Sequence, residues 1–271
     1  MCIRDSLRDA HHTAQVKGIL GPREMTPALL STMITIAPRC RRVYADKRME
    51  THSPGYDVKT TDYHVGTATF QIRTLLDQRQ FSDPDGSAER AGISATSWPN
   101  FGTVWPAGLA LAEEMSRFPV ENKRILEVGC GIGLPSLVLQ QRGANITATD
   151  YHPLAEEFLR HNTDLNGLPP IYFFKAAWME PHLESGRFDL IIGSDLLYEQ
   201  DHPALLAGFI AAHANPACQV LLVDPGRSQC SQFSSLMAAQ GYARTESRLR
   251  LPERNTPFFP GRLFSFVRAT A

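Results

Sequence analysis

The sequence predicts an α/β fold with a doubly wound, mostly parallel sheet that carries helices on both faces. Residues 124–150 read as a strand, a glycine-rich turn, a helix, a second strand and a terminal acid. Residues 188–193 form a near-continuous apolar run, which is typical of a parallel strand buried on both faces. Strand and helix patterns alternate from there toward the C-terminus, as they do in sheets of this class.

Length and composition narrow the class of protein. At about 150 residues per domain, the 271 residues correspond to one large domain or to one domain with an extension. The net charge of −1 creates no general attraction to nucleic acid or to a membrane surface, so we expect neither as a partner. The five cysteines are scattered without a Cys-x-x-Cys motif, and the histidines show no metal-ligand spacing, so we expect no disulfide framework and no metal. A reducing, cytoplasmic location fits this cysteine usage.

The first 97 residues read as two segments. Residues 1–48 contain nine Lys/Arg against four acids and show no strong periodicity. We assign this segment no function and expect a disordered leader, either a transit peptide or the product of a start site placed upstream of Met49. Residues 49–97 are expected to form an N-terminal extension. Within it, residues 56–81 alternate polar and apolar side chains, which predicts a strand or hairpin.

A glycine-rich turn is the central feature of the main domain, residues 98–271. The strand at 125–128 is followed by glycines at alternate positions, Gly129, Gly131 and Gly133. A helix with Pro135 in its first turn and a strand ending on Asp150 come next. Glycines let the backbone approach a ligand closely, and a helix N-terminus favours negative charge. Because a carboxylate at this strand end can bind a ribose diol, we expect a ligand with a ribose and an anionic or polar tail.

The register of the glycines separates two ligand classes. A dinucleotide site needs Gly-x-Gly-x-x-Gly, but Leu134 follows Gly133 directly, and Glu127 stands two residues before Gly129. This pattern resembles the first motif of class I S-adenosylmethionine (SAM) methyltransferases. The resemblance implies a Rossmann-like sheet of seven strands with an antiparallel last strand, a glycine loop under the methionine part of SAM, and Asp150 on its ribose. A nicotinamide-dinucleotide site and an ordinary glycine turn are the alternatives.

Two tryptophans extend the resemblance to one subgroup, the seven-strand protein-lysine methyltransferases. Trp105 opens a Trp-Pro-x-Gly segment before a predicted helix at 109–118, and in the subgroup this aromatic residue borders the cofactor or the substrate entrance. Trp178 follows the predicted strand at 171–174, where a flat ring can stack on adenine. Ala177 stands where the family usually has an acid, which leaves one adenine contact in doubt. Core packing is the alternative for both rings.

The predicted acceptor site follows the apolar strand at 188–193. Ser194 is assigned to the cofactor site, and Asp195 and Tyr198 lie where a methyl group must be delivered, because open α/β sheets place their sites at the carboxyl ends of strands. The Asp-x-x-Tyr spacing resembles the corresponding motif of the lysine methyltransferases. DNA and glutamine methyltransferases carry two prolines between these positions, and this chain lacks both. A helix cap at Asp195 and a packed Tyr198 are the structural alternatives.

The remaining pattern completes the α/β order. The predicted helix at 153–165 contains Asn162 and Asn166, which match a paired-asparagine feature of the subgroup. Arg227 follows a predicted strand and either faces the substrate or is solvated. The other predicted elements are a helix at 202–214, a strand at 219–223, a helix at 228–240 and strands at 244–251 and 263–268, the final one antiparallel.

These features predict a SAM-dependent N-methyltransferase that acts on a lysine side chain of a protein. Asp195 is expected to orient the acceptor amine and Tyr198 to border it, while the cofactor residues are Trp105, Glu127, Gly129, Gly131, Gly133, Asp150, Trp178 and Ser194. A small-molecule N-methyltransferase acting on a pyridine or amine metabolite, a SAM-binding protein without catalysis and a nicotinamide oxidoreductase are the competing hypotheses. The oligomeric state stays open.

Overall fold

The computed structural model describes residues 55–180, 183–249, 251 and 259–269. The predictions for residues 1–48 and for Met49 as a start site lie outside this range. In chain order the elements are β1 (Val58–Val65), β2 (Ala68–Leu75), α1 (Ser87–Arg90), η2 (Trp98–Gly102), α2 (Pro106–Met115), β3 (Arg124–Val128), α3 (Leu134–Gln141), β4 (Asn145–Asp150), α4 (Ala155–Leu165), β5 (Tyr172–Lys175), η3 (Leu183–Ser185), β6 (Phe188–Ser194), α5 (His202–His213), β7 (Ala214–Asp224), α6 (Gln229–Ala239), β8 (Ala243–Arg248) and β9 (Arg262–Arg268).

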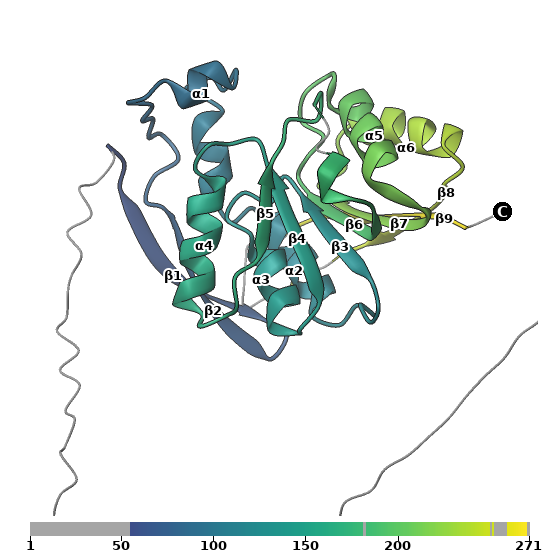
Figure 1. Cartoon of the computed structure of the whole chain (residues 1–271), viewed down its shortest axis with the longest axis horizontal. Coiled ribbons are helices and arrows are strands. Elements are labelled where there is room, and N and C mark those ends of the chain that lie inside the picture. Colours follow the sequence, from purple (N-terminus) through teal and green to yellow (C-terminus); the bar gives the residue numbers. More distant parts are fainter. Residues whose placement is uncertain (1–54, 181–182, 250, 252–258, 270–271) are drawn as a thin grey trace, which may run out of the picture. The chain divides into compact units, whose positions relative to one another are not determined.

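A seven-stranded sheet with the order β5-β4-β3-β6-β7-β9-β8 forms the centre of the described chain (Figure 1). Strands β3 to β7 pair in parallel. Strand β9 is antiparallel to both of its neighbours, β7 and β8. The predicted doubly wound sheet with an antiparallel last strand is therefore confirmed, and the N-terminal strands β1 and β2 form a separate antiparallel hairpin, as predicted.

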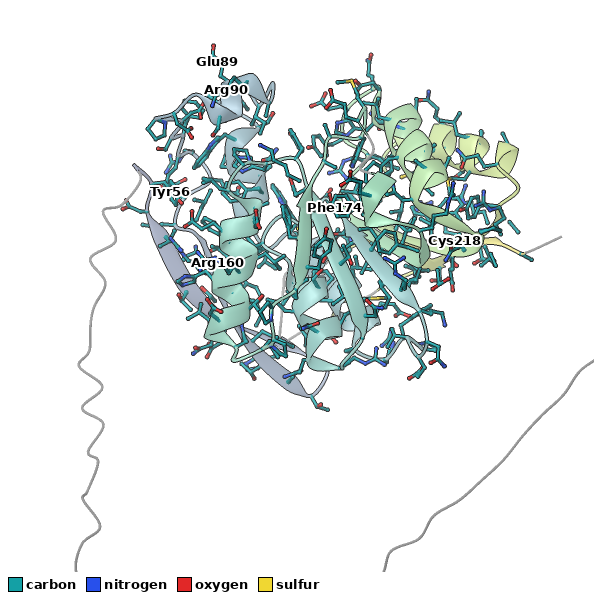
Figure 2. The ribbon with its side chains drawn as sticks, in the orientation of Figure 1. Tyr56, Glu89, Arg90, Arg160, Phe174 and Cys218 are labelled. Atoms are coloured by element: carbon teal, nitrogen blue, oxygen red, sulfur yellow. The ribbon has the colours of Figure 1, made fainter. Side chains whose placement is uncertain are left out.

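The two faces of the sheet carry separate apolar layers, because side chains of a strand alternate between its faces. On β6, Leu190 and Ile192 pack into the layer that includes α2, α3 and α4, whereas Ile191 packs into the layer formed with α5 and α6. All three side chains are fully buried. Figure 2 shows Phe174 and Cys218, which belong to the second layer. Burial of each large apolar side chain contributes about 1.5–3 kcal/mol, and β3 and β7 contribute side chains to both layers in the same way as β6.

Several element boundaries differ from the prediction, and two of the differences have a clear physical cause. Helix α2 begins at Pro106 instead of 109, because a proline at the first helical position loses no hydrogen bond. Strand β7 begins at Ala214, directly after α5, and its first pair with Phe188 is separated from the regular ladder by a register shift. The polar start of this strand, which includes Pro216, does not show the apolar pattern by which a buried strand is recognised.

The hairpin is attached to α4 by the amide side chains of two asparagines. Asn162, fully buried, accepts a hydrogen bond from the backbone N–H of Arg73 at 2.7 Å and donates to the backbone oxygens of Arg73 and Ile132 at 3.3 and 3.2 Å. Asn166 accepts from the backbone N–H of Gln71 at 2.9 Å and donates to its oxygen at 2.8 Å. The paired asparagines therefore join the hairpin to the main sheet domain, and Asn162 also contacts the glycine loop.

Candidate active site

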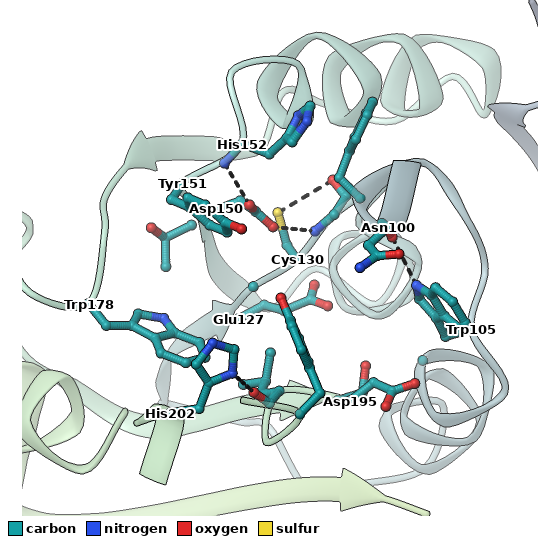
Figure 3. A pocket seen from close by; sticks show the side chains of 18 of the residues that line it. Asn100, Trp105, Glu127, Cys130, Asp150, Tyr151, His152, Trp178, Asp195 and His202 are labelled. Atoms are coloured by element: carbon teal, nitrogen blue, oxygen red, sulfur yellow. Dashed lines mark hydrogen bonds between the residues drawn. The ribbon is translucent and has the colours of Figure 1, made fainter. Parts of the chain in front are cut away.

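A cavity of about 480 Å³ opens at the carboxyl ends of β3, β4 and β6 (Figure 3). These strands are neighbours in the sheet, so the residues that follow them meet at one edge. The cavity brings together nine of the residues that the sequence assigns to the site: Trp105, Glu127, Gly129, Gly131, Asp150, Trp178, Ser194, Asp195 and Tyr198. Gly133 is not among the residues that line it.

The glycine loop takes backbone conformations that other residues rarely adopt. Gly129 and Gly131 have φ angles of +62° and +52°. A Cβ on Gly131 would lie 2.7 Å from the backbone oxygen of Phe101, so this glycine permits the loop to pass against η2. Gly133 precedes α3, and a Cβ there would lie 2.2 Å from Cδ1 of Leu159 on α4. Its role in the free protein is therefore close packing of two helices.

Asp150 connects the glycine loop to the end of β4. Its Oδ2 accepts a hydrogen bond from the backbone N–H of Gly131 at 2.8 Å, and its Oδ1 accepts one from the N–H of His152 at 2.9 Å. The side chain is buried, and burial raises the pKa of the carboxyl while the backbone donors oppose the shift. Each oxygen has a further lone pair, so the carboxylate can accept hydrogen bonds from a vicinal diol in the cavity.

Glu127 is the second buried acid of the cavity. It is 2% exposed, and its Oε2 accepts hydrogen bonds from the backbone N–H and the hydroxyl of Ser136 in the first turn of α3. Burial raises the pKa of this carboxyl to about 8, the Ser136 donors oppose the shift, and Asp150 adds to it. This burial favours a protonated Glu127 at neutral pH, and a positively charged ligand would favour its ionised form.

The two predicted tryptophans lie at different walls of the cavity. The indole N–H of Trp105 donates to the backbone oxygen of Asn100 at 2.8 Å, which fixes the ring in front of α2. Trp178 packs edge-on against His202, with 5.1 Å between ring centroids. Nδ1 of His202 lies 2.7 Å from the backbone oxygen of Leu196 and donates to it, since a carbonyl oxygen only accepts. His202 was predicted only as the start of a helix and not as a residue of the site, because Tyr198 lies before that helix and no helical spacing links the two.

Asp195 stands at the end of β6 in an unusual conformation. Its φ is +61°, a left-handed value that few residues other than glycine adopt. The backbone N–H donates to the oxygen of Val223 on β7 at 2.9 Å, and the carboxylate forms an ion pair with the guanidinium of Arg227. Burial raises the pKa of Asp195, and Arg227 opposes this shift. Both Asp195 and Arg227 line the cavity, so the arginine faces the site.

Tyr198 lies at the mouth of the cavity with 38% of its surface exposed. Its ring packs against His202 at 4.5 Å between centroids, and Tyr151, which follows β4, lines the same cavity. Burial raises the pKa of Tyr198, and the nearby Tyr151 and Asp150 add to the shift. The sequence analysis missed Tyr151, because the residue after a strand end carries no pattern of its own.

Two negative findings apply to the described residues. No group of three or more His, Cys, Asp or Glu side chains there is arranged to hold a metal ion. Within the same ranges, no helix has the length and apolar character that crossing a membrane requires. The cavity is lined by carboxylates, aromatic rings and backbone amides, and also by the imidazole groups of His152 and His202 and the guanidinium of Arg227.

A family model described as a methyltransferase domain matches residues 107–271. The electron transfer flavoprotein beta subunit lysine methyltransferase of Rattus norvegicus is 34% identical over 176 residues, which cover 62% of this chain and 65% of that protein. A protein N-lysine methyltransferase of Danio rerio is 37% identical over 129 residues, which cover 44% of this chain and 55% of that protein. The matched part of the chain thus spans less than two thirds of each relative.

A solved structure agrees with the fold. The 16S rRNA N2 G1207 methyltransferase of T. Thermophilus, in complex with AdoMet and guanosine, superposes with a TM-score of 0.54 at 16% identity. The superposition covers 78% of this chain and 51% of that chain. At this identity the likeness concerns the arrangement of strands and helices alone.

Proposed function

The chain belongs to the methyltransferase-domain family, and from this premise we propose that it transfers the methyl group of SAM to a lysine side chain of a protein. The observation that carries the proposal is that one cavity contains both sets of residues: Asp150, which would bind the ribose of SAM, and Asp195 and Tyr198, which would bind the methyl acceptor. Two relatives that are lysine methyltransferases by name support the choice of acceptor.

The residues present fit SAM as the methyl donor. In this proposal Asp150 binds the ribose diol, the backbone of Gly129 and Gly131 lies against the methionine part, and Trp178 stacks on the adenine. Glu127 is placed to interact with a cationic group, because its carboxyl lines the same cavity and changes its charge near neutral pH. Bound SAM supplies an electrophilic methyl carbon, and the chain supplies orientation, which can contribute about 7–11 kcal/mol.

The acceptor side must bind an amine that has lost its proton. A lysine with a pKa of about 10.4 requires about 4–5 kcal/mol for deprotonation at pH 7. An aromatic wall disfavours the charged amine, and Tyr198 and His202 provide such a wall at the mouth of the cavity. Asp195 then accepts an N–H from the neutral amine and orients its lone pair. In this role Asp195 orients the amine and does not act as its base.

The test separates protein from small-molecule acceptors. The purified chain is incubated with SAM labelled in its methyl group and with a cell lysate, and the products are divided into macromolecules and small molecules. We expect label in protein, released as methyl-lysine after hydrolysis, and label incorporated about 10²-fold more slowly with Asp195→Asn. Label only in small molecules would favour a metabolite methyltransferase. Calorimetry that detected NADH binding but no binding of SAM would contradict the cofactor assignment.

A further inference from the structure

Arg227 joins the ends of two neighbouring strands. It lies three residues after β7, and its guanidinium uses one nitrogen for Asp195 at the end of β6 and the other for Asp224 at the end of β7. The distance from Nη1 to Oδ2 of Asp224 is 2.9 Å. A planar guanidinium can hold two carboxylates in a fixed relation in this way, whereas a single ammonium group cannot.

The loop that carries Arg227 is itself fixed by Asp224. This acid is 2% exposed, and its Oδ1 accepts hydrogen bonds from the backbone N–H groups of Gly226 and Arg227, each at 2.7 Å. Both oxygens of Asp224 are thus used to hold the backbone and the side chain of the same arginine. Such a clamp fixes where the guanidinium meets the cavity, and the interpretation of Arg227 as a solvated surface residue is wrong.

Asp195, which pairs with the guanidinium of Arg227, has a strained backbone conformation. Asp195 adopts a left-handed backbone conformation, which costs a residue with a side chain about 1–2 kcal/mol. It is held there by the hydrogen bond of its N–H to Val223 and by the ion pair of its carboxylate with Arg227. The orientation of the Asp195 carboxylate therefore depends on Arg227 as well as on the backbone conformation of Asp195.

Building on the proposed lysine acceptor, we propose that Arg227 is a positioning residue for methyl transfer. It holds the Asp195 carboxylate where it accepts an N–H from the acceptor amine, and its charge offsets that of Asp195, so that the lysine ammonium gives its proton to solvent. The free lone pair then forms the N–CH3 bond as the S–CH3 bond of SAM breaks, and the electron pair of that bond stays on sulfur. Titratable and charged groups surround the pair on every packed element. Outside the cavity they are Asp224 at the end of β7, Cys230 on α6 and Arg262 on β9; in the cavity they are Glu127, Cys130, Asp150, Tyr151, His152, Tyr198, Asp201 and His202. Arg227 is the charged group that lowers the pKa of Asp195.

Two substitutions separate geometry from charge. Arg227→Lys keeps the positive charge but replaces the two donor nitrogens of the planar guanidinium with a single nitrogen. We therefore expect kcat to fall by about 10-fold while the pH profile of kcat/KM stays unchanged. Arg227→Met removes both, so kcat should fall further and the acidic limb of the profile should move up by about 1 pH unit. SAM affinity should stay at the wild-type value in both. Arg160→Met, on an exposed stretch of α4, is the matched control and should change neither quantity.

A second readout needs no methyl acceptor. The Asp195 carboxyl is titrated by ¹³C NMR, with Asp195→Asn to identify its signal, and the Arg227→Met chain should show a pKa higher by about 1 unit. An unchanged Asp195 titration, or wild-type kcat in Arg227→Lys, would overturn the positioning role. If Arg227→Met unfolds, the Arg227→Lys kinetics decide alone. Failure of the proposed function is distinct: the wild-type chain would then label no lysine while the titration still shifts.

Discussion

The backbone N–H of Gly131 donates a hydrogen bond to Oδ2 of Asp150 at 2.8 Å, so the glycine loop after β3 and the acid that ends β4 form one unit. The proposed cofactor site thus has its ribose acid and its loop already joined. This arrangement reduces the conformational cost of binding, since neither part must be ordered by the ligand.

Replacement of Asp150 with alanine should weaken SAM binding. The substitution removes the proposed acceptor for the ribose hydroxyls and leaves the N–H groups of Gly131 and His152 without their partner. A loss of about 1–3 kcal/mol corresponds to a Kd raised by about 5- to 150-fold. Isothermal titration calorimetry measures the change, with Asp164→Ala on the exposed face of α4 as the control. An unchanged Kd in Asp150→Ala would remove the ribose assignment.

A methyl group at Gly131 should destabilise the fold more than one at Gly143. Both glycines have positive φ, +52° and +71°, so both substitutions carry backbone strain. At Gly131 the added Cβ would also lie 2.7 Å from the Phe101 oxygen, whereas at Gly143 nothing lies within 4 Å. We expect Gly131→Ala to cost about 1–3 kcal/mol beyond Gly143→Ala in urea unfolding, and to weaken SAM binding as well. Equal losses in the two variants would show that the close contact does not matter.

Binding of SAM should release a proton near neutral pH. In the free chain burial raises the pKa of Glu127 to about 8, so the carboxyl is mainly protonated at pH 7. A cationic ligand lowers that pKa and ionises the group. Calorimetry in buffers of different ionisation enthalpy measures the release, and Glu127→Gln should abolish it. S-adenosylhomocysteine, which lacks the sulfonium charge, should release less, and an equal release from both ligands would argue against a contact with that charge.

The raised pKa of Glu127 also determines in which direction the stability of the fold changes with pH. The folded chain binds the Glu127 proton more tightly than the unfolded chain, so this stabilisation is fully present below about pH 4.3, the unfolded pKa. It is lost as the pH rises through the folded pKa of about 8. The pH dependence of unfolding between these values should therefore be smaller in Glu127→Gln than in the wild-type chain.

The substitution Asp195→Asn should lower kcat by about 10²-fold and leave SAM binding nearly intact. Asparagine tolerates the left-handed backbone conformation at this position, with φ +61°, and has almost the same size, so the fold is retained. The variant loses the ion pair with Arg227, so the side chain is no longer held in its orientation toward the acceptor. A misplaced orienting group costs about 10²-fold in rate, so kcat should fall by about that factor. A parallel loss of SAM affinity would instead assign Asp195 to the cofactor.

Loss of the Asn162 amide should loosen the hairpin. The side chain makes three hydrogen bonds to backbone atoms of Arg73 and Ile132, and Asn162→Ala leaves these buried groups unpaired. We expect a stability loss of about 2–4 kcal/mol and faster hydrogen exchange in β2. Asn166→Ala, whose hairpin bonds lie at an exposed site, should cost less. Unchanged exchange in β2 would show that other contacts hold the hairpin.

The sequence predicts those parts of the fold that depend on local pattern. The apolar run of β6 indicates a strand that is buried on both faces. Phe70 and Ile72, two residues apart on the hairpin, indicate a strand that is buried on one face, and the glycine positions indicate a tight turn. The convergence of Asp150 and Asp195 follows from the rule that parallel strands end at one edge of the sheet. Residues that lie far apart in the sequence were therefore predicted to share the cavity.

Other features depend on contacts between elements, which pattern does not encode. Gly133 has the same spacing as Gly129 and Gly131, yet its lack of a side chain serves the packing of α3 on Leu159. The sequence left Arg227 between two interpretations, because the pairing with Asp195 depends on how two neighbouring strand ends are turned toward each other.

Asn162 and Asn166 hold the hairpin through main-chain atoms alone, at Gln71 and Arg73. Every amino acid except proline presents the same N–H and C=O groups. The side chain at Gln71 can therefore be exchanged without loss of these bonds, whereas a proline at either position would break them. Arg73 is more constrained, because its guanidinium also lies 3.7 Å from Glu157 and over the ring of Phe158 on α4. The hairpin thus combines a docking that any residue except proline can supply at Gln71 with one that depends on the side chain at Arg73.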